Sequence, residues 1–500
     1  MELQFAPKTM HYLQCVHYQC GTQEETLELI VPDSFPDAEK TLCSSALVVL
    51  RGKECSQTGA SANGGVRANV LYMAAEETQP RSLEAYLPFT IKVDVQKLCD
   101  DGDVNFAVNV RSVDVRMLNS RKLLLRVNLC WTMSVYGPCK QELYSLDEAP
   151  ADLQTKTTEY SMMLPAETAE CTFQMAEELS LPSNRPLVGS VLRFQPRLEI
   201  TERRLAGNKA VFKGVAHLHV LYVTEADEIA AYDTEWPFSQ YCELHDIYEE
   251  EDVQIHACLA GCECDRTMQQ DADGLLVTLH ILAQCVVMRR ENVCITDDAY
   301  SLSGKLVPQW TECTIENCLD QQRMTRMVRE NKNANVQEIV DAWAYSDLGK
   351  VTKTNDGVEV TLPSTVNLLY RDDAGKLQSM SFRTELKESI AAAENVKCRA
   401  YAEVAGEVVA IPSGNSIDLR YPIAVTIESF SDGTYRTLSG GEILEQKENA
   451  ERPAVILRKT SGGEPLWDIA KKNGTTVEKI RSANRVNDDF TEAGVILIPV

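Results

Sequence analysis

The cysteines of this sequence are the side chains whose type and spacing suggest chemistry most directly. Cys258, Cys262 and Cys264 are the closest group of thiols, and cysteine thiolates are common ligands of a tetrahedral zinc ion. The C-x3-C-x-C spacing is not that of a zinc knuckle, and no C-x2-C pair occurs elsewhere in the chain. We therefore expect no metal site. The alternative is a zinc ion completed by one of four later cysteines: Cys285, Cys294, Cys313 or Cys318.

Two histidines and a group of carboxylates also have spacings that could do chemistry. His217 and His219 are two residues apart on an expected strand, so both side chains point to one face of the sheet. A third metal ligand is not evident, and we interpret the two as a pair on a sheet surface. Asp100, Asp101 and Asp103 surround a glycine, which is typical of a turn and lacks the register of a calcium loop.

Motifs of catalysis and nucleotide binding are absent from the sequence. There is no P-loop, G-x-G-x-x-G, H-E-x-x-H or G-x-S-x-G pattern, and there are only seven histidines. The sequence therefore predicts a protein that is not an enzyme, with no cofactor and no catalytic residue. The alternative, an active site hidden in one part of the chain, requires polar side chains unique to that part to converge in a pocket.

The charge balance limits the partners of the chain. Its 74 acidic and 49 basic residues give a formal net charge of -25 at pH 7, which repels phosphate backbones and disfavours nucleic acid and anionic lipid. Residues 451–500 differ, with eight Lys/Arg and seven Asp/Glu, which indicates a separate module. The acidic run at 248–253 is interpreted as a solvated loop, with a docking patch for a basic partner as the alternative.

Targeting and redox features point to one compartment. The N-terminal residues lack a basic start followed by an apolar run, so we expect no secretory signal. No stretch approaches ~18 consecutive apolar residues, so we expect no transmembrane segment. These patterns predict a soluble protein that stays in the cell that makes it. The seventeen cysteines, from Cys15 to Cys398, are then expected to be reduced and mostly buried.

A pentapeptide that occurs three times divides most of the chain into repeats. The segments NVLYM, HVLYV and NLLYR place Tyr72, Tyr222 and Tyr370 at separations of 150 and 148 residues, which is one domain length. We interpret the pentapeptide as a core strand and its tyrosine as a packing residue with a satisfied hydroxyl. The alternative is ligand stacking. A phenylalanine follows each tyrosine after a polar gap: Phe89, Phe238 and Phe382.

The elements that make up each repeat are expected to be strands. Apolar residues alternate with a period of two at 104–115 and 357–370, which is typical of half-buried strands. Turn-forming residues at 61–65, 205–209 and 354–359 are expected to connect hairpins.

The predicted fold class is mainly β. It consists of three repeated β-rich domains, each a sandwich or a partly open barrel of largely antiparallel strands, followed by a small C-terminal βααβ domain. The predicted domains are 1–150, 151–303, 304–450 and 451–500. A few short helices are also expected, near 37–45, 186–194 and 335–345.

The last fifty residues change from period two to helical spacing. The apolar segments 454–459 and 495–500 predict two strands. Between them, Pro465 suits the first position of a helix, and Gly474 suits its left-handed cap. Thr475 begins a Thr-x-x-Glu capping box that opens a second helix. The order is therefore βααβ.

This tail resembles a LysM module. The residues that carry the resemblance are the Gly-Glu-Pro turn, the Leu-Trp-x-Ile-Ala helix start, the Lys-Lys-x-Gly-Thr-Thr turn and the Ile-Pro end. The resemblance implies binding of N-acetylglucosamine polymers, peptidoglycan or chitin, in a shallow groove between two loops. Carried over to this sequence, the groove residues are Gly463, Glu464, Pro465 and Leu466 in the first loop and Asn484, Val486 and Asn487 in the second.

Two departures from the LysM pattern bear on that expectation. The usual Gly-Asp-Thr is Gly-Glu-Pro at 463–465, and the proline removes a hydroxyl and a backbone donor that a sugar amide could use. The usual Pro-Gly-Gln before the last strand is Ala-Gly-Val at 493–495. Both changes weaken the case for glycan and leave a fold that could bind protein instead.

The body is similar to the SPOCS-domain proteins of spore-forming Firmicutes. The resemblance rests on the repeated β domains with VLY and PF motifs and on the run NSRKLLLRV at 119–127, ahead of a C-terminal LysM module. Resemblance to the clostridial spore coat morphogenetic family implies a non-enzymatic coat assembly or scaffold protein in the mother-cell cytoplasm, at the forespore surface. Its tail would dock the spore coat anchoring ATPase or other coat proteins. The alternative is a peptidoglycan-binding protein acting through the LysM module. Cross-linking of cysteines in the mature coat is a further option.

Overall fold

The computed structural model describes residues 2–5, 7–74, 77, 79–95, 102–144, 150, 152–182, 184–249, 251–269, 272–355, 357–391, 396–445, 453–485 and 489–500. Four residues singled out in the sequence lie outside the described residues: Asp100, Asp101, Val486 and Asn487. Within the described part the chain is almost entirely β-strand, with two short helices near the C-terminus.

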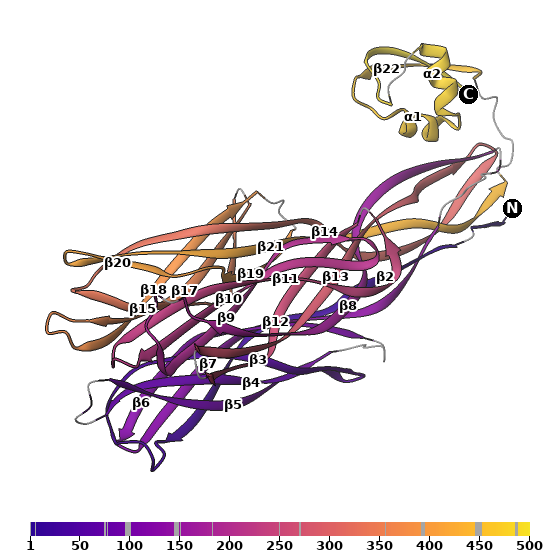
Figure 1. The fold of residues 1–500 in the computed structure, drawn as a ribbon. Helices are drawn as coiled ribbons and strands as arrows, with labels where there is room; N and C mark the ends of the chain where they lie inside the picture. Colours follow the sequence, from indigo (N-terminus) through magenta and orange to yellow (C-terminus); the bar gives the residue numbers. More distant parts are fainter. Residues whose placement is uncertain are drawn as a thin grey trace.

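The strands fall into three consecutive units (Figure 1). The first unit contains β2 (Pro7–Ile30), β3 (Ala38–Ser56), β4 (Gly59–Ala74), β5 (Pro80–Asp94), β6 (Asp103–Asn119) and β7 (Lys122–Tyr144). The second contains β8 (Leu153–Ser180), β9 (Val188–Leu205), β10 (Gly207–Thr224), β11 (Ile229–Tyr248), β12 (Asp252–Gln269) and β13 (Ala272–Ser301). The third contains β14 (Gly304–Asn333), β15 (Glu338–Ser346), β16 (Lys350–Thr354), β17 (Gly357–Arg371), β18 (Leu377–Ile390), β19 (Lys397–Val404), β20 (Val409–Ser413) and β21 (Ser416–Glu445).

The pairing order of the strands is the same in all three units. In the first, β3-β4-β5 form one antiparallel sheet and β2-β7-β6 form another. The second unit repeats this with β9-β10-β11 and β8-β13-β12. In the third unit, the central strand of one sheet is β17, with β18 on one side and both β15 and β16 on the other. The central strand of the other sheet is β21, with β14 on one side and both β19 and β20 on the other. The two sheets of a unit share one apolar core, so each unit is a sandwich and the predicted mainly β fold is confirmed.

The repeated tyrosines lie on the central strands β4, β10 and β17. The side chains of Tyr72 and Tyr222 are fully buried. Their hydroxyls donate hydrogen bonds of 3.2 Å to the carbonyl oxygens of Pro36 and Pro186. Tyr370 takes the corresponding place but is partly exposed. The pentapeptide is therefore a core strand, and burial leaves no ring face of Tyr72 or Tyr222 free for ligand stacking.

The prediction of short helices near 37–45, 186–194 and 335–345 is wrong. These segments fall at the starts of strands β3, β9 and β15. Each strand has a bulge there, between Thr41 and Cys43 in β3 and between Ile339 and Asp341 in β15. A bulge adds one residue and breaks the period of two, which produced an apolar spacing that resembles a helix.

The prediction of a hairpin turn at 61–65 is also wrong, because the segment lies inside β4. Gly64 is there because a Cβ atom at this position would collide with the ring of Phe89 and with the backbone of Val49. Gly214 stands in the same relation to the ring of Phe238, one repeat later. Glycine in a strand can mark such a close approach instead of a turn. The turns expected at 205–209 and 354–359 do separate strands.

The first and last strands of each unit extend beyond the sandwiches and join in a shared stem (Figure 1). One apolar cluster in the stem takes residues from all three units: Met10, Tyr12, Leu143, Met162, Leu164, Val293, Ile295, Cys313 and Ile315. The short strand β1 (Glu2–Gln4) also pairs with β21 of the third unit. The domain boundaries at residues 150, 303 and 450 stay a prediction, but the three units share one stem.

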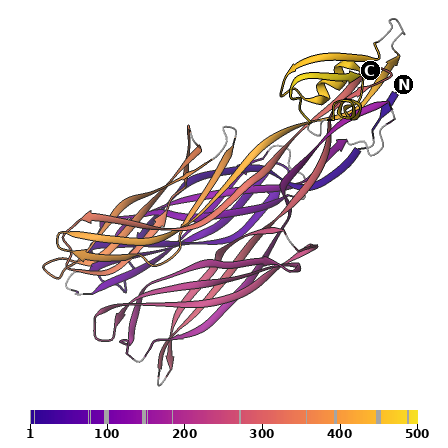
Figure 2. The ribbon, with the colours of Figure 1, turned by 90° about the horizontal axis from the view of Figure 1, so that it is seen from above.

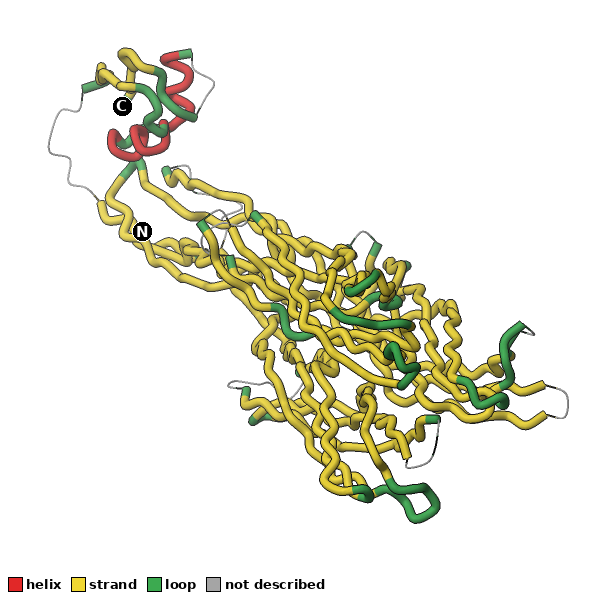
Figure 3. Tube along the Cα trace, turned by 90° about the vertical axis from the view of Figure 1, so that its left-hand side faces the viewer, coloured by secondary structure: helices red, strands yellow, loops and turns green. Residues whose placement is uncertain are grey.

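The C-terminal module has the predicted βααβ order, with β22 (Val455–Ser461), α1 (Leu466–Asn473), α2 (Val477–Asn484) and β23 (Ala493–Pro499). It lies beside the end of the stem (Figures 2 and 3). Gly474 caps α1 with φ 63°, as expected. Pro465 is the cap before α1 and not its first residue. Thr476 caps α2 in place of Thr475, because the Thr475 amide still bonds to the carbonyl of Ala470 at 3.1 Å.

The cysteines whose structure is described are all free thiols, of which six are buried, eight partly buried and two exposed. Cys258, Cys262 and Cys264 lie along β12 opposite apolar residues of β13. In the part of the chain that is described, no group of three or more Cys, His, Asp or Glu side chains could hold a metal ion.

Candidate functional site

The first loop of the predicted groove is held by backbone bonds to the segment before β23. The amide of Gly463 donates to the carbonyl oxygen of Thr491 at 2.8 Å. The amide of Thr491 donates in return to the carbonyl oxygen of Glu464 at 2.9 Å. The amide of Leu466 donates to the carbonyl oxygen of Asp489 at 2.8 Å. The two segments that flank the groove are therefore fixed to each other.

The four predicted residues of this loop have different environments. Leu466 is 2% exposed and belongs to the module core. Glu464 forms an ion pair of 2.6 Å with Arg458. Gly463 is exposed with φ 79°, a backbone conformation that favours glycine. Pro465 is partly exposed and supplies no side-chain hydrogen bond to the helix.

Asn484, the described residue of the second loop, uses its side chain inside the module. Its Nδ2 donates to the carbonyl oxygens of Ile480 at 2.8 Å and Leu497 at 2.6 Å. Its Oδ1 accepts from the amide of Leu497 at 2.7 Å. The amide thus joins α2 to β23 and has little capacity left for a ligand. Val486 and Asn487 lie outside the described residues.

The module has an exposed apolar surface that the sequence analysis did not predict. Leu457 and Leu497 are opposite each other on β22 and β23, on the face that points away from the module core. With Val455 and Val495 they form what we call the aliphatic face. The exposed fractions are 70% for Leu457, 39% for Leu497, 51% for Val455 and 66% for Val495. The signal was available, because continuous apolar runs in β22 and β23 indicate strands that are apolar on both faces.

An acidic side chain of the stem contacts the first helix of the module. Asp298 on β13 accepts hydrogen bonds from Trp467 Nε1 at 2.8 Å and from Lys471 Nζ at 2.6 and 2.8 Å. Burial alone would raise the pKa of Asp298, but these bonds outweigh it and lower the pKa below its ordinary value. This contact, which we call the clamp, holds α1 against the second unit.

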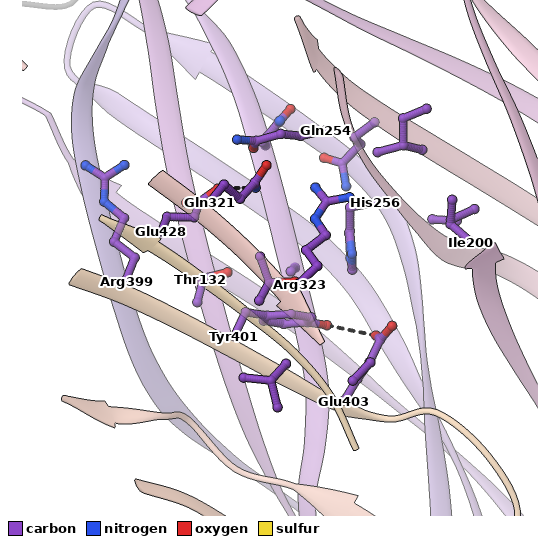
Figure 4. Close-up of a pocket in the computed structure, with 18 of the residues that line it drawn as sticks. Thr132, Ile200, Gln254, His256, Gln321, Arg323, Arg399, Tyr401, Glu403 and Glu428 are labelled. Carbon is purple, nitrogen blue, oxygen red and sulfur yellow. Dashed lines mark hydrogen bonds between the residues drawn. The ribbon is translucent and has the colours of Figure 1, made fainter. Parts of the chain in front are cut away.

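A polar cavity of about 430 Å³ lies where the three units meet. Its wall includes β6, β12 and β19, the corresponding strands of the three units. His256, Arg323 and Tyr401 come from three different strands and project into it (Figure 4). No local signal in the sequence marks this cavity, because its lining comes from strands of all three units, and His256, Arg323 and Tyr401 are each more than 60 positions apart in the chain.

The ionisable groups of the central cavity are shifted by burial. Burial raises the pKa of Glu403 to about 7, although the Tyr401 hydroxyl donates to it at 3.3 Å. Burial and the charge of Lys53 lower the pKa of His256 to about 4, so its ring is neutral at pH 7. Tyr401 also accepts a hydrogen bond of 2.8 Å from Asn109. The groups can bind polar molecules or ordered water.

His217 and His219 do share one face of β10, as predicted, but each contacts carboxylates. His217 lies 3.1 Å from both Glu199 and Glu235. His219 lies 2.7 Å from Asp233 on β11 and 3.3 Å from Asp341 on β15 of the third unit. The interpretation as a pair on a sheet surface is therefore incomplete, because His219 belongs to a contact between units.

Comparison with protein families decides the domain content. Residues 187–267, which cover β9, β10, β11 and most of β12, match the family described as SipL, SPOCS domain. Residues 463–498 match the LysM domain. The chain combines a SPOCS domain with a LysM domain. No curated protein and no solved structure matches it.

This pair of domains indicates a sporulation-related protein with a capacity to bind peptidoglycan or a related carbohydrate. The SPOCS match falls on the second unit, and the first and third units repeat its strand order. Neither helix of the described chain has the length and apolarity needed to cross a bilayer.

Proposed function

We propose that the chain is a non-enzymatic assembly protein of the spore coat, whose LysM module docks a coat protein at the forespore surface, in the mother-cell cytoplasm. The spore coat anchoring ATPase and other coat proteins are the candidate partners. The SPOCS units supply an acidic body, and the module supplies the recognition surface.

The observation that carries this proposal is the aliphatic face of the LysM module. Leu457 and Val495 are about two thirds exposed, at 70% and 66%. A contiguous apolar patch on a soluble domain commonly marks an interaction site. A protein is a better occupant of this face than an anionic membrane. Membrane binding would bring a body with a net charge near -25 against anionic headgroups, which repel it.

A rigid body favours a scaffold role, and side chains between the units provide that rigidity. The buried pair Arg193 and Asp341 joins the second unit to the third. Tyr345 of the third unit accepts a hydrogen bond of 2.9 Å from the amide of Ala46 in the first. Fixed units in one chain raise the effective concentration of weak contacts at a surface.

The absence of catalysis is part of this proposal. In the central cavity, several polar side chains bond to one another or to the backbone. Gln284 bonds to the amide and carbonyl of Phe106 at 3.0 and 2.8 Å and accepts from Lys53 at 2.7 Å. Such a satisfied network is typical of a structural junction.

Capture from extracts of sporulating cells tests the docking role. We expect the double substitution Leu457→Ser with Val495→Ser to reduce capture of coat proteins by about tenfold or more, since apolar anchors dominate interfaces. Ile30→Ser is the matched control, because Ile30 is 66% exposed and lies on β2 of the first unit. Full capture by the double variant, together with normal coat localisation, would contradict the proposal.

Peptidoglycan binding is the second candidate, favoured by the LysM match across both loops of the groove. We expect the full chain to sediment with purified cell wall if this function holds. Pro465→Thr restores the hydroxyl and the backbone donor of the usual pattern, so it should strengthen binding of chitin oligomers. Failure of both the natural chain and Pro465→Thr to bind wall or oligomers would exclude this candidate.

A further inference from the structure

A second recess lies between the LysM module and the stem. This cleft has a volume of about 1000 Å³. One wall comes from β13, β14 and β21 of the stem, and the other from β22 and the end of α1. It is distinct from the predicted glycan groove, because the groove lies at the start of α1 and the cleft at its end.

The cleft is rich in unpaired cations. Lys156, Lys305, Arg436 and Lys472 are all exposed and line it. Among the described residues, none of the four forms an ion pair with a carboxylate. The guanidinium of Arg436 lies 4.2 Å from the ring of Trp310, which holds it in place.

The carboxylates of the cleft do not neutralise these cations. Asp298 is engaged by Lys471 and Trp467 in the clamp. Asp297 accepts a hydrogen bond of 2.7 Å from Thr158. Among the side chains that line the cleft, five are cationic and two are carboxylates. In a chain with a net charge of -25, this cleft is a local site of positive potential and selects anions.

The uncharged part of the lining favours a peptide over a glycan. Leu306, Pro308 and Ile456 give it an aliphatic floor that suits the side chains of a polypeptide. A sugar ring is usually held against an open aromatic face, and the aromatic rings here are engaged. Trp310 is covered by Arg436, and Tyr300 contacts Trp467 edge to face at 4.9 Å.

We propose that this cleft binds an acidic, amphipathic peptide segment of the protein partner. Carboxylates of the segment pair with Lys156, Lys305, Arg436 and Lys472, and its aliphatic side chains contact the floor of the cleft. The inference rests on the proposed docking function and adds the chemistry of the docking segment. The cleft adjoins the aliphatic face through β22, so one partner can occupy both.

The test is the anisotropy of a labelled peptide of alternating glutamate and leucine, titrated with the full chain. We expect binding that weakens steeply with added salt. The double variant Lys305→Glu with Lys472→Glu should weaken it by about tenfold or more, since like charges then face the peptide. Lys92→Glu is the matched control, because Lys92 is an exposed lysine on β5, far from the cleft in sequence and fold.

Four results would overturn the inference. The first is peptide binding by the cleft variant equal to that of the natural chain. The second is equal binding of a lysine–leucine peptide. The third is displacement of the acidic peptide by soluble peptidoglycan fragments at equal potency, and the fourth is salt-sensitive self-association that the cleft variant abolishes. Each of the last two would assign the cleft to another occupant.

The two proposals fail separately. If Leu457→Ser with Val495→Ser removes capture of coat proteins and the cleft variant does not, the inference fails and the docking function stands. If the natural chain captures no coat protein but binds the acidic peptide through the cleft, the docking function fails and the cleft remains a peptide site.

Discussion

The hydroxyl of Tyr300, on the last strand of the second unit, donates a hydrogen bond of 2.7 Å to the carbonyl oxygen of Thr475 in the LysM module. Tyr300 is only 6% exposed and shares an apolar cluster with the module core. The module is therefore docked on the stem and not merely tethered to it. This docking creates the cleft and leaves the aliphatic face of β22 and β23 in solvent.

Acid should release the module from the stem. The pKa of Asp298 lies below its ordinary value of 3.8 in the docked state. The clamp is therefore fully favourable above pH 3.8 and is lost as the pH falls through the lowered pKa. Small-angle scattering of the full chain should show a larger radius of gyration in acid. Asp298→Asn should show the larger radius already at neutral pH; an unchanged radius would contradict the role of the clamp.

The contact between the second and third units should depend on pH in the alkaline range. Burial lowers the pKa of His219, but the charge of Asp341 and the hydrogen bonds to Asp233 and Asp341 outweigh burial and raise it to about 9. Its contribution to stability is full below the ordinary pKa of 6.5 and is lost as the pH rises through about 9. We expect the melting temperature to fall over that window.

His219→Gln should flatten this alkaline limb of the melting profile, at some cost in stability at neutral pH. Its matched control is His245→Gln, because His245 is 95% exposed and lies outside the unit contact. Burial raises the pKa of Asp341, but the charges of Arg193 and His219 outweigh it and lower the pKa to about 2, so the contribution of Asp341 to stability is present above pH 3.8 and is lost as the pH falls through about 2. An identical pH profile for natural chain and His219→Gln would disprove the ion-pair assignment.

The repeated tyrosines should differ in what their hydroxyls contribute. Tyr72→Phe and Tyr222→Phe each remove a hydrogen bond to a proline carbonyl. We expect each to lower the free energy of unfolding by about 1 kcal/mol, measured by urea denaturation. Tyr370→Phe serves as the comparison, because Tyr370 is partly exposed and should cost less. Equal effects at all three positions would show that the repeats use this tyrosine identically.

The stem should couple the three units. Leu164 is 1% exposed in the stem cluster that all units share. Leu164→Ala should lower the free energy of unfolding by about 2–5 kcal/mol. Leu276→Ala is the control on the same unit, because Leu276 is 43% exposed. If Leu164→Ala destabilised only the second unit, and the first and third units unfolded as in the natural chain, the stem would not couple the stabilities of the units.

The local pattern predicted much of the fold, and its failures have local causes. The alternation at 357–370 and the spacing of Tyr72, Tyr222 and Tyr370 identified core strands that repeat three times. The predicted helices near 37–45 and 335–345 are strands, because bulges shift the alternation of apolar and polar residues there. The predicted turn at 61–65 is also part of a strand, because Gly64 accommodates the ring of Phe89. Neither a bulge nor a packing glycine is marked by its own neighbours in sequence.

The sequence by itself determined the mainly β class, the threefold repetition and the βααβ module, because period and capping are properties of neighbouring residues. It also named the loop at 463–466 as a candidate site. Only the tertiary structure decided that Asn484 is used inside the module, that Asp298 and Tyr300 hold the module, and that four distant cations line one cleft. Such contacts join positions far apart in the chain, and burial, charge and distance between them exist only once the chain has folded.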